Sequence, residues 1–216
     1  MLVIIQARTS SSRFRNKILH SFYGKTLIEH VIDKIKKSKK IKIVVATSKN
    51  KEDDKLVSFL IDKKIKYYRG SLNNVAKRLY DTATFEKQNF FLRISGDSPL
   101  IDFRLINKII NISDKNKNFD LITNIFPRTF PSGQSVEIIK TATLGKNLKY
   151  FSKLDKEHVT RYFYRNSPKF KIKNFIDKQK YNTKKLSIDT FNELKIILKL
   201  FNRKKFINYS YSNEKN

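Results

Sequence analysis

Apolar and polar positions alternate in blocks along the first half of the chain, and the blocks predict strands and helices in turn. Short apolar runs bounded by polar residues are typical of buried strands, and they occur at 2–5, 41–46, 65–68 and 90–94. Between these runs, apolar residues recur at helical spacing over 25–37, 53–63 and 74–86, with lysines on the other faces. This alternation predicts an α/β fold with a doubly wound, mostly parallel sheet and helices on both faces.

The second half of the chain has a looser pattern, which predicts a small mixed α+β lobe. Asp102 is placed to cap a helix that carries Leu105, Ile106, Ile109 and Ile110. Further strands are expected at 121–123, 136–139, 170–176 and 186–188, and helices at 154–165 and 192–201. No segment is rich enough in Gly or Pro to divide the chain. We expect one domain over 1–202, followed by a basic tail over 203–216 that frays.

Composition narrows the class of protein. The 216 residues are 39% hydrophobic and 12% aromatic, which is enough for a core, and cysteine is absent, which excludes disulfides and thiolate metal sites. The first residues lack the pattern of a signal peptide, and no apolar run approaches the roughly 20 residues of a membrane helix. We therefore expect a cytoplasmic protein with no membrane partner.

The formal net charge of +28 is compatible with a nucleic-acid partner. However, 36 of the 47 cationic residues are lysines, and they are spread over nearly every segment at positions that fit solvated helix faces. The chain has neither the basic and aromatic pattern of RNA-recognition motifs nor the spacing of zinc ligands. We expect no specific nucleic acid, although a nucleic-acid-binding protein remains an alternative.

A polar, basic loop follows the first predicted strand. The segment 6–17 reads QARTSSSRFRNK and holds four cations, at Arg8, Arg13, Arg15 and Lys17. Ligands of open α/β sheets bind at the carboxyl ends of strands, where cations and backbone N–H groups can hold a triphosphate. The alternative is a solvated basic loop. The five glycines form neither a P-loop nor a G-x-G-x-x-G motif, which disfavours a nicotinamide dehydrogenase.

Five segments in chain order resemble the cytidylyltransferases that activate acidic sugars. They read Q-A-R-x-x-S-x-R-x-x-x-K over 6–17, R-G-S followed by N-V and R over 69–78, R-I-S-G-D-S-P-L-I-D over 93–102, E-H-V-T with a later N-x-P over 157–168, and I-D-T with a later Leu over 187–194. The group includes SpsF-type spore-coat polysaccharide proteins, which fit best, and the CMP-sialic acid and CMP-KDO synthetases. In the first segment the family usually has Gly, Pro and Gly where Ser10, Arg15 and Asn16 stand.

The resemblance implies a fold like that of nucleotide-diphospho-sugar transferases (GT-A or Rossmann-like) and a reaction in which a sugar-acid hydroxyl attacks the α-phosphate of CTP, for surface polysaccharide or glycan biosynthesis. It implies four catalytic residues: Arg8, Arg13, Lys17 and Asp97. The implied nucleotide-binding residues are Gln6, Ala7, Arg8, Ser11, Arg13, Lys17, Arg69, Gly70, Ser71, Arg78, Ser95 and Gly96.

Two carboxylates that follow predicted strands, Asp97 and Asp189, are expected to share a Mg²⁺ ion, which prefers oxygen ligands. For Asp189, a helix N-cap is the alternative. The implied acceptor-binding residues are Gln134, Glu137 and His158, whereas His20 and His30 are expected to be structural. In the acceptor loop 130–137, Ser132 and Ser135 stand where the family has acids, so the acceptor can differ.

The expected partners are CTP and an acidic sugar, and a homodimer is possible because related synthetases often dimerise. Three alternatives stay open besides the cytidylyltransferase. They are a transferase of the same fold that uses another nucleotide, a glycosyltransferase, and a degenerate member that only binds a partner. The triphosphate-binding cations of 8–17 speak against the glycosyltransferase.

Overall fold

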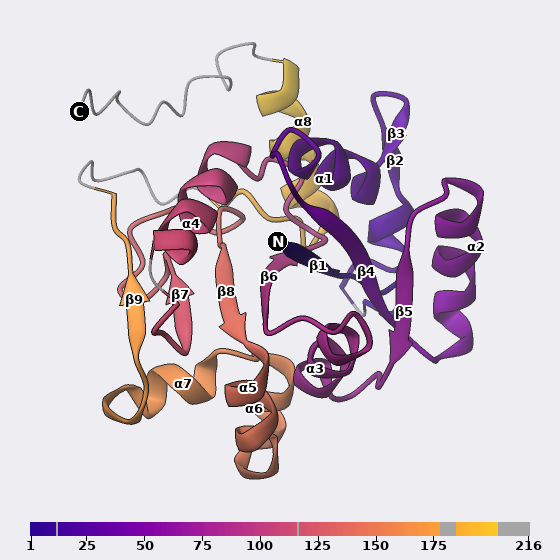
Figure 1. Cartoon of the computed structure of the whole chain (residues 1–216). Coiled ribbons are helices and arrows are strands. Elements are labelled where there is room, and N and C mark those ends of the chain that lie inside the picture. Colours follow the sequence, from indigo (N-terminus) through magenta and orange to yellow (C-terminus); the bar gives the residue numbers. More distant parts are fainter. Residues whose placement is uncertain (12, 116, 178–184, 203–216) are drawn as a thin grey trace.

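A seven-stranded sheet forms the centre of the protein (Figure 1). The computed structural model describes residues 1–11, 13–115, 117–177 and 185–202. The strands lie in the order β5-β4-β1-β6-β8-β7-β9. Their bounds are β1 Leu2–Gln6, β4 Lys42–Ser48, β5 Tyr67–Gly70, β6 Phe90–Ser95, β7 Leu121–Thr123, β8 Glu137–Lys140 and β9 Ile172–Asn174. Strand β8 is antiparallel to β6 and β7, and the other pairs are parallel, which confirms the predicted mostly parallel sheet.

Helices cover both faces of the sheet, as the alternating pattern predicts. One face packs against α1 Leu27–Ile35, α2 Asp54–Asp62, α4 Phe103–Lys115 and α8 Phe191–Asn202. The other packs against α3 Val75–Phe85, α5 Thr141–Asn147, α6 Lys153–Glu157 and α7 Arg161–Arg165 (Figure 1). Short 3₁₀ helices lie at η1 Lys17–Leu19, η2 Lys51–Asp53, η3 Leu148–Tyr150 and η4 Ser167–Lys169, and a separate hairpin joins β2 Ser21–Phe22 to β3 Lys25–Thr26.

The core divides into two layers because the central strands are buried on both faces. In β1, Val3 and Ile5 belong to the layer under α1, whereas Leu2 and Ile4 belong to the layer under α3. All four side chains are almost fully buried. Continuous apolar strands of this kind are typical of parallel sheets between two layers of helices, and each such side chain contributes about 1.5–3 kcal/mol of burial free energy. The rigid sheet that results fixes the loops at its carboxyl edge.

Two predicted elements are wrong. The segment 186–188 is not a strand, because its backbone pairs with two loops: Leu186 N–H donates to the Ser132 carbonyl and Ile188 N–H to the Asp97 carbonyl. The predicted helix over 154–165 is interrupted between α6 and α7, where His158 has non-helical backbone angles of φ −101° and ψ 65°. The interruption buries Val159 completely and turns His158 and Thr160 toward the site described below.

Asp102 caps α4 as expected, since its carboxylate accepts the backbone N–H of Arg104 at 2.8 Å. The predicted basic tail over 203–216 lies outside the described residues. Among the described helices, none combines the length and the apolar character that a membrane span requires.

Candidate active site

A cavity of about 710 Å³ opens at the edge of the sheet where β1 and β6 end. It brings together most of the site residues predicted from the sequence: Gln6, Ala7, Arg8, Ser11, Arg13, Lys17, Arg78, Ser95, Asp97, Glu137, His158 and Asp189. Seven cationic side chains and four carboxylates line it: Arg8, Arg13, Lys17, Arg78, Arg93, Arg128 and Arg161, with Asp97, Glu137, Glu157 and Asp189. This excess of positive charge in one concave site suits an anionic ligand.

The loop after β1 is anchored by a buried carboxylate that the sequence did not single out. Asp53, fully buried before α2, accepts the backbone N–H of Thr9 at 2.6 Å and its hydroxyl at 2.8 Å. Its other oxygen accepts the backbone N–H and the hydroxyl of Ser48 at the end of β4. Burial alone would raise the pKa of Asp53, but these hydrogen bonds from Ser48 and Thr9 lower it below its ordinary value. The carboxylate therefore joins the ends of β1 and β4.

Asn16 gives the same loop its sharp turn. It adopts the left-handed conformation with φ 57° and ψ 18°, directly before η1. Asparagine tolerates this region better than other non-glycine residues. The departure from the family's glycine at this position is therefore compatible with the turn. The next residue, Lys17, begins η1 and lines the cavity.

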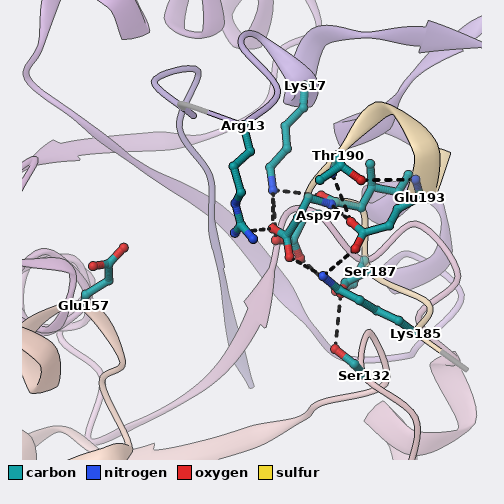
Figure 2. Close-up of polar contacts among 12 residues, drawn as sticks. Arg13, Lys17, Asp97, Ser132, Glu157, Lys185, Ser187, Thr190 and Glu193 are labelled. Carbon is teal, nitrogen blue, oxygen red and sulfur yellow. Dashed lines mark hydrogen bonds and ion pairs between the residues drawn. The ribbon is translucent and has the colours of Figure 1, made fainter. Parts of the chain in front are cut away.

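Lys17 lies between the two carboxylates predicted to bind metal. Its Nζ donates to Asp97 Oδ2 at 3.3 Å, to Asp189 Oδ1 at 3.0 Å and to the Ile188 carbonyl at 2.8 Å. Figure 2 shows Lys17 and Arg13 pointing toward the same group of carboxylates, where Arg13 pairs with Asp189. The ammonium is thus surrounded by three oxygen acceptors in a part of the cavity where only 10% of the lysine side chain is exposed.

Asp189 is held by cations on both sides. Arg13 approaches its Oδ1 at 3.3 Å, and Lys185 donates to its Oδ2 at 2.6 Å. Lys185 also donates to Glu193, whose carboxylate accepts the backbone N–H of Asp189 (Figure 2). Burial would raise the pKa of Asp189, but the bonds from Lys185 and Lys17 lower it to about 2, so the group is ionised at neutral pH.

The oxygen atoms that surround Lys17 are suitable ligands for a Mg²⁺ ion. In the part of the chain that the structure describes, no group of three or more His, Cys, Asp or Glu side chains is arranged so that it could hold a metal ion by itself. Mg²⁺ commonly uses only one or two carboxylates, together with waters and substrate phosphates. Asp97 and Asp189, which already share one cation at Lys17, supply two such ligands beside an open cavity.

Arg78 is a buried cation that has no carboxylate partner within the described part of the chain. It projects from α3 with 2% exposure, donates to the Ser71 carbonyl, and leaves its Nε buried without a hydrogen-bond acceptor. Burial, followed by the charge of Arg8, lowers its pKa to about 10. Gly70 makes room for it, because a Cβ at Gly70 would lie 2.8 Å from Arg78 Cγ. An anion beside Arg78 would satisfy a group that the protein leaves unpaired.

Four of the predicted residues lie outside the cavity lining and support it: Arg69, Gly70, Ser71 and Gly96. Arg69 donates to the carbonyls of Ser48 and Asn50, both at 3.0 Å, and holds that loop rather than a ligand. Ser71 provides the carbonyl for Arg78. Gly96 allows the loop after β6 to contact β1, since its N–H donates to the Gln6 carbonyl at 2.9 Å and a Cβ there would meet Gln6 O at 3.0 Å.

Gln134 is also displaced from the role expected of it. Its amide donates to the Leu100 carbonyl at 2.6 Å and accepts the Asp102 N–H at 2.9 Å, and the residue is buried. The side chain therefore fastens the loop after β6 and is not available to an acceptor.

Glu137 does lie in the cavity, inside a hydrogen-bonded network. Its two oxygens accept from Arg93 and from the Tyr164 hydroxyl, and Arg93 Nε also donates to Gln6 Oε1 at 2.8 Å. Burial and the neighbouring Glu137 charge raise the pKa of Tyr164, so this phenol stays protonated and donates. The network fixes the orientation of the Glu137 carboxylate.

Arg128 is a second cavity cation that pairs with no carboxylate among the described residues, and it belongs to none of the motifs found in the sequence. It stands in the loop between β7 and β8 and donates to the Ser135 hydroxyl at 3.2 Å. Burial lowers its pKa, an effect that the charge of Glu137 opposes. Arg78 projects from α3 and Arg128 from the loop between β7 and β8, and both line the cavity.

One histidine lines the cavity, and the other two are half-buried against aromatic side chains. His158 lines the cavity in the interruption between α6 and α7. His30 stacks on Phe22 and bonds its carbonyl at 2.9 Å, and His20 lies edge-on to Phe14 and Phe191. The last two are structural.

Comparison with known proteins identifies the family. The family model described as cytidylyltransferase matches residues 2–215. An uncharacterised protein of Methanocaldococcus jannaschii is 35% identical over 202 residues, which cover 91% of this chain and 81% of that protein. The spore coat polysaccharide biosynthesis protein SpsF of Bacillus subtilis is 26% identical over 94% of this chain and 87% of its own. A 3-deoxy-manno-octulosonate cytidylyltransferase of Fusobacterium nucleatum is 30% identical over 56% of this chain and 49% of its own.

Comparison with solved structures leads to the same family. A cytidylyltransferase from Leptospira borgpetersenii superposes with a TM-score of 0.82 at 27% identity, covering 89% of this chain and 83% of the other. A CMP:2-keto-3-deoxy-manno-octonic acid synthetase complexed with CTP has a TM-score of 0.70 at 16% identity, covering 93% and 98%, and shares the fold. Together with the match over nearly the whole chain, these findings show that the protein belongs to the cytidylyltransferase family of nucleotidyltransferases.

Proposed function

We propose that this protein transfers CMP from CTP to a hydroxyl of an acidic sugar, using Mg²⁺ and releasing pyrophosphate, in the biosynthesis of a surface polysaccharide or glycan. The observation that carries the proposal is the cavity with an excess of cations, in which neither Arg78 nor Arg128 pairs with a carboxylate of the described residues. A nucleoside triphosphate and an acidic acceptor are two anions that such cations would hold.

The triphosphate would lie against the loop after β1. Arg8 and Arg13 line the cavity with side chains that are 36% and 64% exposed, so they are free to reorient toward phosphate oxygens. Ser10 Oγ is buried beside the cavity without a hydrogen-bond partner, and Arg78 has its unpaired Nε nearby. Charge-assisted hydrogen bonds from such groups stabilise the negative charge that develops on departing pyrophosphate.

Asp97 and Asp189 would hold Mg²⁺, for which their oxygens and the adjoining open cavity are suited. When bound, the ion supplies charge neutralisation at the α-phosphate. A distant structural neighbour, Rv0371c of Mycobacterium tuberculosis, was solved in complex with manganese, which supports divalent-metal binding in this fold.

The acidic sugar would lie between Arg128 and the Glu137 network. Arg128 is suited to its carboxylate, because the guanidinium is exposed in the cavity and, among the described residues, its hydrogen-bond partner is a neutral hydroxyl. Glu137, oriented by Arg93 and Tyr164, can accept sugar hydroxyls, and His158 lies on the same cavity wall. The SpsF protein and the octulosonate cytidylyltransferases among the relatives support this class of acceptor.

In the reaction, the acceptor oxygen forms a bond to the α-phosphorus while the bond from that phosphorus to the β-phosphate oxygen breaks. Pyrophosphate leaves with the electron pair, and the hydroxyl proton passes to water. The protein contributes mainly orientation of the two anions and stabilisation of charge, which is typical of phosphoryl-type transfer.

Pyrophosphate release tests this proposal. The protein with Mg²⁺ and CTP should release pyrophosphate in the presence of nonulosonic or octulosonic acids and not with neutral sugars of the same size. CTP should give faster release than ATP, GTP or UTP. Equal rates with all four nucleotides would favour a transferase with another base preference, and release independent of every sugar acid would contradict the acceptor class.

A further inference from the structure

We propose that Lys17 is a built-in counter-ion that keeps divalent metal out of the Asp97–Asp189 site until nucleotide binds. The inference rests on the proposed function for the identity of the metal and the nucleotide. Its basis is the position of Lys17 Nζ, which is hydrogen-bonded to both carboxylates and to the Ile188 carbonyl. Two carboxylates and a carbonyl are ligands that a hard divalent cation prefers, and here an ammonium occupies the space between them.

The charges around this position are already balanced. Three cations, Arg13, Lys17 and Lys185, contact the cluster of Asp97, Asp189 and Glu193 (Figure 2). A divalent ion that entered alone would add two positive charges to a half-buried cluster without excess charge. A nucleoside triphosphate brings about four negative charges at neutral pH, so metal and nucleotide together restore the balance.

Lys17 can give way without unfolding its surroundings. It begins η1, a single 3₁₀ turn directly after the left-handed Asn16, and its ammonium is carried on a flexible four-carbon side chain. The same side chain lines the cavity in which the proposed triphosphate would lie. Once a metal replaces it between the carboxylates, the released ammonium is within the cavity and available to phosphate oxygens. One residue thereby couples metal entry to nucleotide entry.

The test is the affinity for Mn²⁺ in the absence of nucleotide, measured by calorimetry and by the electron paramagnetic resonance signal of free Mn²⁺. Lys17→Met should bind Mn²⁺ about tenfold more tightly than the wild type or better, because a cation close to the metal position is removed. Lys17→Gln, which keeps a neutral polar side chain, should shift the affinity in the same direction.

Arg15→Met is the matched control. Arg15 lies in the same loop and loses the same charge, but its partner is Glu52 at 3.1 Å and it does not line the cavity. It should leave Mn²⁺ affinity unchanged. In Lys17→Met, the carboxylate pair is no longer neutralised by an ammonium, so the melting temperature should be higher in Mg²⁺ than in EDTA. The double variant Lys17→Met with Asp97→Asn should melt at the same temperature in both.

Unchanged or weaker Mn²⁺ binding by both Lys17 variants would overturn the inference, as would an equal gain in the Arg15 variant. These measurements contain neither CTP nor sugar. Their failure would therefore leave the proposed transfer reaction standing, and failure of the transfer reaction would not decide the role of Lys17.

Discussion

Asp53→Asn is the substitution that most directly tests how the fold prepares the nucleotide loop. The carboxylate accepts four hydrogen bonds, two from Thr9 on one oxygen and two from Ser48 on the other. Asparagine keeps the shape but replaces one oxygen by an NH₂ group. Whichever side that group takes, a backbone N–H of Thr9 or Ser48 then faces another donor.

The expected loss of stability follows from those four hydrogen bonds. Hydrogen bonds to a charged group contribute about 1.5–3 kcal/mol, and a buried donor left unsatisfied costs about 1–3 kcal/mol. Burying a neutral amide costs less than burying a carboxylate, and this difference offsets part of the loss. We therefore expect the free energy of unfolding to fall by about 3 kcal/mol. Because the loop after β1 must then be ordered by its ligand, CTP should bind about tenfold more weakly.

Urea unfolding and calorimetric titration with CTP and Mg²⁺ measure the two effects. Asp54→Asn is the matched control: Asp54 is the next residue, is exposed, and has one ion pair with Arg69 at 2.7 Å. It should change stability by less than about 0.5 kcal/mol. If Asp53→Asn were as mild as this control in both assays, the view that Asp53 holds the nucleotide loop would be refuted.

Three further predictions concern the site. Asp97→Asn should lower kcat on the order of a hundredfold in the pyrophosphate assay with an unchanged circular dichroism spectrum, because an amide is a neutral, weaker Mg²⁺ ligand; near-normal turnover at saturating Mg²⁺ would contradict its role. Arg128→Leu should raise KM for the acidic sugar roughly tenfold or more and leave CTP affinity unchanged, with partial recovery in Arg128→Lys, whereas weaker CTP binding would place Arg128 with the nucleotide. The folded pKa values of Asp53 and Asp189 lie below 3.8, so the unfolded chain takes up protons first as pH falls. Their contribution to stability is present above the unfolded pKa of about 4 and is lost as pH falls through the folded pKa, which is about 2 for Asp189. Acid unfolding of Asp53→Asn should therefore depend less on pH below about 4, and an unchanged slope would contradict the depressed pKa of Asp53.

The sheet was predictable because its central strands are continuous apolar runs that differ clearly from the helices between them. The exceptions have physical causes. Leu186 and Ile188 are buried like strand residues, but their N–H groups bond loop carbonyls, which no periodicity reveals. The interruption between α6 and α7 was hidden because the buried Val159 continues the apolar pattern of a helix.

The candidate site was predictable where position along the sheet and resemblance to the family agreed, as for the cations of the loop after β1. Residues that act through distant contacts were missed. Asp53 contacts Thr9 across 44 positions and has the appearance of a helix cap in the sequence. Arg128 belongs to no motif, and only the structure shows that it lines the cavity beside the Ser135 hydroxyl. The family resemblance assigned Gln134 to the acceptor. Only the structure reveals that its side-chain amide is hydrogen-bonded to Leu100 and Asp102.

Transfer of label from CTP carrying ³²P at the α-phosphate tests the central claim most directly. With Mg²⁺ and an octulosonic or nonulosonic acid, the account predicts that the label appears in a CMP-sugar, with one pyrophosphate released for each label transferred. Neutral sugars should yield no labelled product, and neither should Asp97→Asn. Label that stayed in CTP with every acid offered, or that moved equally well to neutral sugars, would contradict the assignment of this cavity to cytidylyl transfer onto an acidic sugar.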